Sequence, residues 1–379
     1  MKNPDYVPTP WSVELTQLNL EWKALTLRRQ GTLITLAVCI FALLFNAFAA
    51  KRLPLFEGVI LFFHIFGFFA INVPLWVLAP KASSKEVWTN FQNFGGWSST
   101  GAAVIVGQLA AAGAFIGADS AAHMAEEVRN ASLTVPRMMI GTVALNGVLG
   151  FVTILTLLYS IQDVDQQVVQ STAVYPFIGI FATAVGSDAG AIGMTIPMII
   201  LSISMCLNAV AAASRQAWSF SRDEGLPFRR IFRKITVIDG SPLPINAMVA
   251  SLAIAMILAL LNLGGTAAFN SIMGLVTGAV GLTYALSIGC VLWRRLFGEP
   301  LPPARWSLGR FGVWVNGFAF FYECFTVTIS FFPLFAHVDA LSMNWAIAMF
   351  GGAAILCSIN YFVNGKRYYK GPVVYLARD

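Results

Sequence analysis

The residues best suited to chemistry lie in one stretch, residues 98–125, where a carboxylate follows a run of small apolar side chains. Gly113 and Gly117 come before Asp119 and weaken the helix that the apolar run predicts. An unpaired carboxylate at membrane depth costs at least about 2.5 kcal/mol, so Asp119 would have to be paired or face water. The pattern predicts a discontinuous helix whose freed backbone groups can bind a small solute. The alternative is an ordinary helix whose glycines let a neighbour pack closely.

Three further ionisable residues follow this carboxylate. His123 lies one turn beyond it and can share its proton, and a histidine that only packs is the alternative. Glu126 and Glu127 lie further along, with Arg129 and Arg137 close by in the sequence. These two acids are candidates for gating, and interfacial ion pairing with the arginines is the alternative.

Other polar residues are spread over the remaining apolar runs. His64 and Glu323 are ionisable groups inside such runs, where each is a functional candidate by default. Ser204 and Asn208 make the run at 188–213 polar on part of its surface. That polar surface predicts either the lining of a cavity or interhelical hydrogen bonds.

Composition places these residues in a membrane. Hydrophobic residues make up 57% of the chain and charged residues 11%, whereas a soluble domain carries about 25% charged residues. A membrane-crossing helix needs about 20 mostly apolar residues, and such runs predict an all-α polytopic membrane helix bundle. The nine candidate spans are approximately 31–50, 54–79, 98–125, 138–161, 188–213, 244–263, 270–293, 312–335 and 343–363.

The distribution of basic residues predicts the orientation of this bundle. Of the 24 Lys and Arg residues, 18 fall in one set of alternate connections and the C-terminal tail, and only Lys81 and Lys85 in the other set. Cytoplasmic loops carry the excess of Lys and Arg, so we expect a cytoplasmic C-terminus and an external connection at 162–187. The predicted organisation is a polar N-terminal segment at 1–30, a transmembrane domain at 31–363 and a cytoplasmic tail at 364–379.

Several classes of function lack their signatures. The sequence holds no G-x-S-x-G, H-E-x-x-H, P-loop or G-x-G-x-x-G motif, so we expect neither an enzyme nor a bound cofactor. Three histidines leave little for a metal site, and the five cysteines, all inside apolar runs, are expected to act as small hydrophobic side chains. No nucleic-acid-binding motif accompanies the net charge of +6. The N-terminal segment holds no apolar core, so no cleavable signal peptide is expected.

A set of motifs in a fixed order resembles a known family. It comprises residues 74–80, the stretch Phe115-Ile116-Gly117-Ala118-Asp119-Ser120 with 123–127 and 136–137, then 214–218 with 222–227, 298–302 and 371–373. These motifs resemble those of fungal GABA and choline permeases, which belong to the amino acid–polyamine–organocation superfamily. The resemblance runs from about residue 31 to the C-terminus.

This resemblance implies a fold of about twelve helices built from an inverted repeat of five. A small-molecule amine or amino-acid substrate would bind midway, between the broken first and sixth helices. The substrate-binding residues it implies are Ile116, Gly117, Ala118, Asp119 and Ser120, with Asn208 and Asn270 along the path. Asp119 would recognise an amine or couple transport to protons, and His123, Glu126 and Glu127 are the other coupling or gating candidates.

The chain also departs from the family pattern. Its nine spans match helices four to twelve, so the first three helices, with the first broken helix, are expected to be absent. A cytoplasmic C-terminus then puts residues 1–30 outside, with Lys23, Arg28 and Arg29 on the side that the charge bias disfavours. We therefore expect that this chain does not transport by itself.

The predicted function is that of a truncated secondary transporter in the plasma membrane, with the lipid bilayer as its surroundings. Its substrates would be amino acids or related amines such as GABA, choline or polyamines, with protons as the candidate coupling ion. A non-transporting membrane scaffold or receptor, or an inactive fragment of such a permease, is the alternative. No oligomeric state is predicted.

Overall fold

The computed structural model describes residues 10–171, 175–264, 266–339 and 342–371. The longer elements are α1 (Pro10–Phe48), α2 (Leu53–Leu78), α4 (Thr100–Ala114), α6 (Ala131–Ser160), α7 (Pro176–Val185), α8 (Asp188–Arg222), α10 (Ile245–Leu260), α11 (Thr266–Phe297), α12 (Gly312–Ser330) and α13 (Ala346–Asn360). The short ones are η1 (Ala50–Arg52), α3 (Ser84–Thr89), α5 (Ser120–His123), η2 (Ala125–Glu127), η3 (Asp165–Val169), α9 (Arg229–Phe232), β1 (Thr236–Ile238), β2 (Ser241–Leu243), η4 (Leu261–Gly264), η5 (Gly309–Phe311), η6 (Tyr361–Gly365) and α14 (Lys366–Tyr368).

The predicted all-α membrane helix bundle is confirmed, because each predicted span coincides with a helix in the described part of the chain. The helices long and apolar enough to cross a membrane are Arg29–Phe48, Ala50–Leu78, Ala131–Ser160, Asp188–Arg222, Asn270–Phe297 and Ala346–Tyr368. The spans predicted at 98–125 and 244–263 correspond to the shorter apolar helices α4 and α10. The span predicted at 312–335 corresponds to α12, which has 19 residues.

Two segments differ from the sequence prediction. The helix α1 begins at Pro10, well before the span predicted at 31–50, because the Leu, Glu, Lys and Arg residues of the polar segment are good helix formers that hydropathy does not mark. The connection at 162–187 contains α7, an apolar helix of 10 residues. A helix of that length is too short to cross a bilayer, so α7 adds no span.

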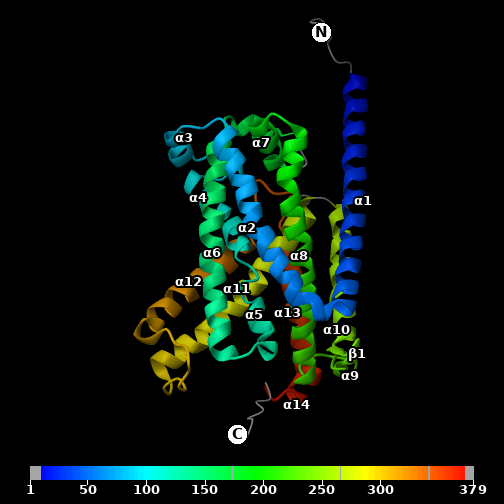
Figure 1. Ribbon diagram of the computed structural model, residues 1–379, viewed down its shortest axis with the longest axis vertical. Helices are drawn as coiled ribbons and strands as arrows, with labels where there is room; N and C mark the ends of the chain where they lie inside the picture. Colours follow the sequence, from blue (N-terminus) through cyan, green and yellow to red (C-terminus); the bar gives the residue numbers. More distant parts are fainter. Residues whose placement is uncertain (1–9, 172–174, 265, 340–341, 372–379) are drawn as a thin grey trace, which may run out of the picture.

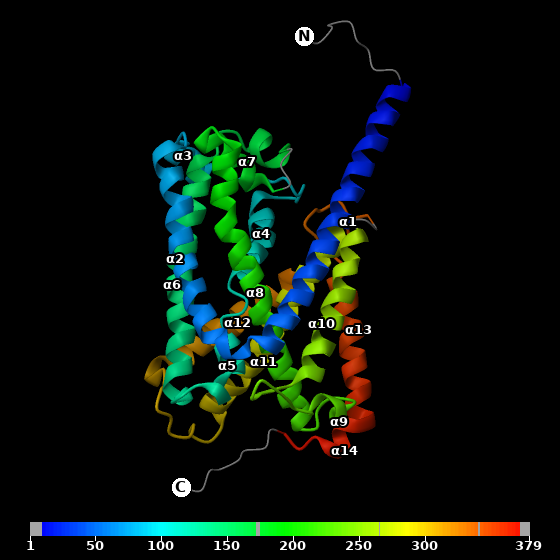
Figure 2. The ribbon, with the colours of Figure 1, turned by 45° about the vertical axis from the view of Figure 1, so that its right-hand side comes forward.

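Most of the long helices run up and down the molecule, while α11 and α12 cross it obliquely, and the connections lie at its two ends (Figures 1 and 2). The short helices α3 and α7 lie at one end, and α9, the β1–β2 hairpin and α14 lie at the other (Figure 1). The two strands of this hairpin are antiparallel, with Val237 opposite Pro242. Because successive helices alternate in direction, alternate connections share an end, as the charge pattern requires.

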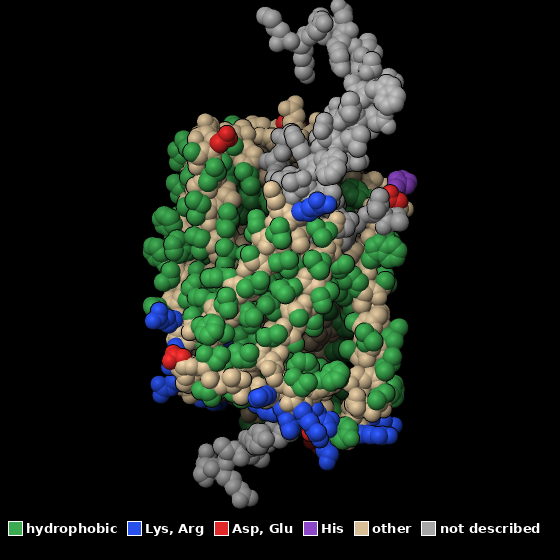
Figure 3. Space-filling model, turned by 90° about the vertical axis from the view of Figure 1, so that its right-hand side faces the viewer, with side chains coloured by type: hydrophobic (Ala, Val, Ile, Leu, Met, Phe, Trp, Pro, Cys, Tyr) green, Lys and Arg blue, Asp and Glu red, His purple; other side chains and the backbone are tan. Residues whose placement is uncertain are grey.

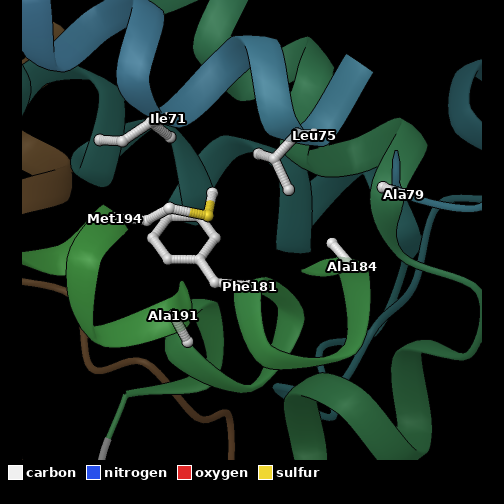
Figure 4. Close-up of a cluster of buried hydrophobic side chains, with 7 residues drawn as sticks. All are labelled: Ile71, Leu75, Ala79, Phe181, Ala184, Ala191 and Met194. Carbon is white, nitrogen blue, oxygen red and sulfur yellow. The ribbon is translucent and has the colours of Figure 1, made fainter. Parts of the chain in front are cut away.

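A buried hydrophobic cluster joins α2, α7 and α8 at the α7 end (Figure 4). Leu75 of α2 is 0% exposed and Phe181 of α7 is 1% exposed, and both belong to one cluster with Met194 of α8. Burying large apolar side chains such as these stabilises the fold by about 1.5–3 kcal/mol each. The cluster explains why α7 folds onto the bundle instead of continuing as an open loop.

The molecular surface has the pattern of a membrane protein. Large hydrophobic side chains on the outside of the helices are highly exposed, including Phe62 (65%), Val148 (64%) and Phe318 (76%). Figure 3 shows a broad band of hydrophobic side chains, with Lys and Arg side chains gathered below it at the α9 end. Such a band next to a basic end is the arrangement that a bilayer and its cytoplasmic face favour.

Candidate functional site

The predicted break in the helix of residues 98–125 is present. Helix α4 ends at Ala114, and α5 begins at Ser120. Between them Gly117 has a φ of +97°, a conformation that favours glycine because it has no Cβ. A Cβ built at Gly113 would meet nothing within 4 Å, so close packing of a neighbouring helix does not explain that glycine.

The break leaves backbone groups available. The amide of Ser120 donates to the carbonyl of Gly117 at 3.1 Å, and the Ser120 hydroxyl donates to the same carbonyl at 2.7 Å. Within the described residues, the amides of Gly117, Ala118 and Asp119 have no hydrogen-bond acceptor. Unpaired amides beside a glycine turn can bind a carboxylate or another polar group of a ligand.

Asp119 lies at the end of the break and has two polar neighbours. Its Oδ2 atom lies 3.0 Å from Nε2 of His123, one turn further on. The hydroxyl of Tyr284, from α11, lies near the Asp119 carboxylate. The side chains of Asp119 and His123 remain 24% and 30% exposed, so the pair is fixed in position but still open to a ligand.

A cavity of about 300 Å³ adjoins the break. Its walls come from α4, α6, α11 and α12. The lining includes Phe115, Ile116, Gly281, Tyr284, Tyr322, Glu323 and Thr326. Ligand pockets in proteins range from about 300 to 1,000 Å³, so this cavity suits a small solute.

Two polar groups on the cavity wall lack partners within the described residues. The hydroxyl of Thr326 is buried and unpaired, and the carboxylate of Glu323 forms no ion pair there. Gly281 allows Glu323 to lie close to α11, because a Cβ at that position would come 3.1 Å from Oε2 of Glu323. An unpaired hydroxyl and an unpaired carboxylate on one wall can receive a cationic, hydrogen-bonding ligand.

The predicted site residues are not all in one place. Ile116 lines the cavity, the break contains Gly117, Ala118 and Asp119, and Ser120 is the first residue of α5. Asn208 on α8 instead lies near Glu57 of α2, and it is not among the residues that line the cavity. Asn270 lies near the start of α11, before the turns of that helix that line the cavity.

Most of the cavity lining has no signal in the sequence. It includes Tyr284 of α11 and Tyr322 of the neighbouring α12. Glu323 was a candidate because it is ionisable inside an apolar run, and it lines the cavity. Tyr284 carried a weaker signal, since a tyrosine at mid-span has a hydroxyl that needs a partner. Nothing in the sequence indicated that its partner is Asp119, because the two residues are far apart in the chain.

Glu126 forms an ion pair with Arg222 of α8, not with Arg129 or Arg137 as sequence proximity suggested. Nη1 and Nη2 of Arg222 donate to the two carboxylate oxygens at 3.2 and 3.0 Å. This hydrogen-bonded guanidinium holds the pKa of the Glu126 carboxyl below its usual range. The pair joins the end of the broken span to the end of α8, while the side chain of Glu127 lies outside the described residues.

Comparison with known sequences places this geometry in context. The profile of a family described as amino acid permease matches residues 3–355. The chain is 29% identical over 335 residues to a choline transporter of Saccharomyces cerevisiae, covering 87% of this chain and 58% of that protein. It is 30% identical over 294 residues to amino-acid permease 2 of Neurospora crassa, covering 78% of this chain and 53% of that protein.

A third relative is an uncharacterized amino-acid permease of Schizosaccharomyces pombe, 27% identical over 339 residues. The alignment covers 89% of this chain and 61% of that permease. The chain therefore spans between half and two thirds of the length of these relatives. The matched region includes the broken span and the α11–α12 wall.

Proposed function

Since the chain belongs to the amino acid permease family, we propose that it is a transmembrane secondary transporter for amino acids or related amines. The observation that carries this proposal is the Asp119 carboxylate, which pairs with His123 and lies near Tyr284 at a helix break next to a cavity. Secondary transporters bind their substrates at discontinuous helices near the bilayer midplane. Substrate contacts are proposed at residues 116–120, with Asn208 and Asn270 further along the path.

The charges around the cavity favour an amine as the substrate class. Glu323 lies on its wall and Asp119 lies beside it, while the lining contains no Lys or Arg. An ammonium group would compensate these acids in a setting where an unpaired charge is costly. GABA, choline and polyamines all carry such a cation. Asp119 and His123 could also exchange a proton, and we propose protons as the coupling ion.

The transport proposal is tested by uptake. The chain would be expressed in cells that lack their own amine and amino-acid permeases, and saturable uptake of labelled GABA, choline and putrescine would be measured. In keeping with the expectation from its sequence, the chain alone should show no saturable uptake, whereas a version extended to the full length of its relatives should take up at least one of the three solutes. An extended version that inserts correctly but takes up none of the three would contradict the proposal, and would favour the non-transporting scaffold, receptor or inactive fragment.

We propose a plasma-membrane location with the α9 end in the cytoplasm, on the basis of the basic residues gathered there. The orientation is tested by labelling cysteines introduced one at a time into a variant without the five native cysteines. Asp165→Cys in the opposite connection should react with a membrane-impermeant thiol reagent on intact cells. Arg230→Cys in α9 should react only after permeabilisation. The reverse labelling pattern would contradict this orientation.

We propose that the Glu126–Arg222 pair acts as a gate at this cytoplasmic end. A partly exposed ion pair contributes about 0–1 kcal/mol, so Glu126→Gln should speed cytoplasmic labelling of a cysteine introduced at Ser120 by up to about fivefold. Because the pKa of Glu126 is lowered, the pair is intact at neutral pH and weakens only as pH falls through that lowered value.

The measurement is the labelling rate in inside-out vesicles, again without the native cysteines. Glu299→Gln is the matched control, since Glu299 is exposed and belongs to another connection at the same end. Equal rates for the wild-type and Glu126→Gln backgrounds at neutral pH would show that the pair does not gate access.

A further inference from the structure

The connection between α8 and α10 forms a small ordered structure at the basic end of the molecule. It consists of α9 and the β1–β2 hairpin, and residues 228–243 are called here the α9–hairpin segment. Its base is fixed to the bundle, because Trp218 donates to the carbonyl of Arg233 at 3.2 Å and Asn246 donates to that of Ile231 at 2.8 Å. Lys51 also pairs with Asp239 at 3.2 Å. The segment is thus held in a defined position.

Large apolar side chains of this segment point away from the protein. Phe228 is 73% exposed, Val237 67% and Ile231 54%. Phe228 also has a φ of +56°, which is unfavourable for a bulky residue. Fixed apolar side chains of this kind, gathered on one small segment, need an apolar surface to cover them.

Basic side chains lie among these apolar ones. Arg230, Arg233 and Lys234 are exposed, and none of them forms an ion pair within the part of the chain that the structure describes. Arg229 differs, because it lies 3.6 Å from Glu224 and stacks over the ring of Tyr368 at 4.0 Å. Three positive charges are therefore free to meet an anionic partner.

We propose that the α9–hairpin segment docks on the bilayer itself and binds the anionic headgroups of its cytoplasmic leaflet. Segments that lie in the membrane interface combine apolar side chains, buried at the headgroup boundary, with Lys and Arg that pair with anionic lipids. The segment lies at the basic end, next to the hydrophobic band (Figure 3), which is the level of the headgroups. This inference does not depend on what the protein transports.

The test measures the depth of the segment in vesicles. The full chain, without its native cysteines, carries Ile231→Cys labelled with an environment-sensitive fluorophore and is reconstituted with lipids bearing a quencher near the headgroup. The vesicles contain three parts phosphatidylcholine to one part phosphatidylserine, or phosphatidylcholine alone. We expect strong quenching in the anionic vesicles and clearly less in the neutral ones. Glu299→Cys gives the matched label at an exposed position of the same end.

Removing charge should weaken docking. Each basic residue near an anionic surface raises the ratio of docked to undocked segment about fivefold. The double variant Arg233→Gln/Lys234→Gln should therefore lower that ratio by up to about 30-fold. Arg305→Gln/Arg310→Gln removes the same charge from another connection and should leave the quenching at position 231 unchanged. Arg233→Lys should retain the docking, which separates a loss of charge from a loss of structure.

Three results would overturn the proposal. The first is equal quenching at positions 231 and 299 in anionic vesicles, because the segment would then lie in water. The second is equal quenching at position 231 in neutral and anionic vesicles, because anionic headgroups would not be recognised. The third is a restoration of quenching in neutral vesicles by inorganic phosphate, because the ligand would then be a free anion.

Discussion

Replacing Asp119 with Asn is expected to lower binding of an amine substrate, and its uptake by a version extended to the full length of the relatives, by at least about 30-fold, because the loss of one partner of a desolvated charge pair costs about 2–5 kcal/mol. The carboxylate is held by the contact with His123, so its position does not depend on the substrate. An asparagine of the same shape keeps the hydrogen bonds but loses the charge. If the substrate amine is not the partner, the same substitution should instead remove the pH dependence of uptake.

The measurements are equilibrium binding of labelled choline or putrescine to the purified chain in lipid nanodiscs, and uptake over a range of pH by cells that express the full-length version. Asp188→Asn is the matched control, because Asp188 is an exposed residue in the first turn of α8. The amount of protein at the membrane is measured for each variant. Unchanged binding and unchanged uptake across pH would assign Asp119 to packing alone.

The local part of this site could be predicted from the sequence. Glycine weakens a helix locally, so a glycine in an apolar run marks the break. A buried charge is costly wherever it lies, so an ionisable residue in the same run marks the carboxylate. Gly117 and Asp119 were recognised in this way, and the structure has the break between Ala114 and Ser120. The roles of these residues in binding remain predictions.

The partners of these residues could not be predicted, because they depend on tertiary contacts. Tyr284 reaches Asp119 from α11, far along the chain. Glu126 pairs with Arg222, 96 residues away, although two arginines are much closer in the sequence. Hydrophobic periodicity locates helices but not the neighbours of each helix, so these contacts had no sequence signal.

Replacing Gly274 with Ala is expected to destabilise the chain, because α12 and the start of α13 leave no room for a methyl group. A Cβ at Gly274 would come 2.6 Å from the carbonyl oxygen of Ser330 and 3.1 Å from Cβ of Ala346. That carbonyl cannot move freely, since it also accepts a hydrogen bond from Asn344 at 2.9 Å. Overpacking of this kind costs about 1–3 kcal/mol.

Replacing Gly317 with Ala is expected not to destabilise the chain. It is therefore the matched control for the same glycine-to-alanine change. Gly317 lies inside α12, and a Cβ there would meet nothing within 4 Å. Alanine is more favourable than glycine in a helix interior by about 0.5–1 kcal/mol. Thermal unfolding of the purified chain in detergent should therefore show a lower midpoint for Gly274→Ala, and an unchanged or higher midpoint for Gly317→Ala. Equal unfolding temperatures for the two variants would contradict the close packing of Gly274 against the end of α12. The cavity wall that carries Tyr284 and Glu323 would then have to be placed differently.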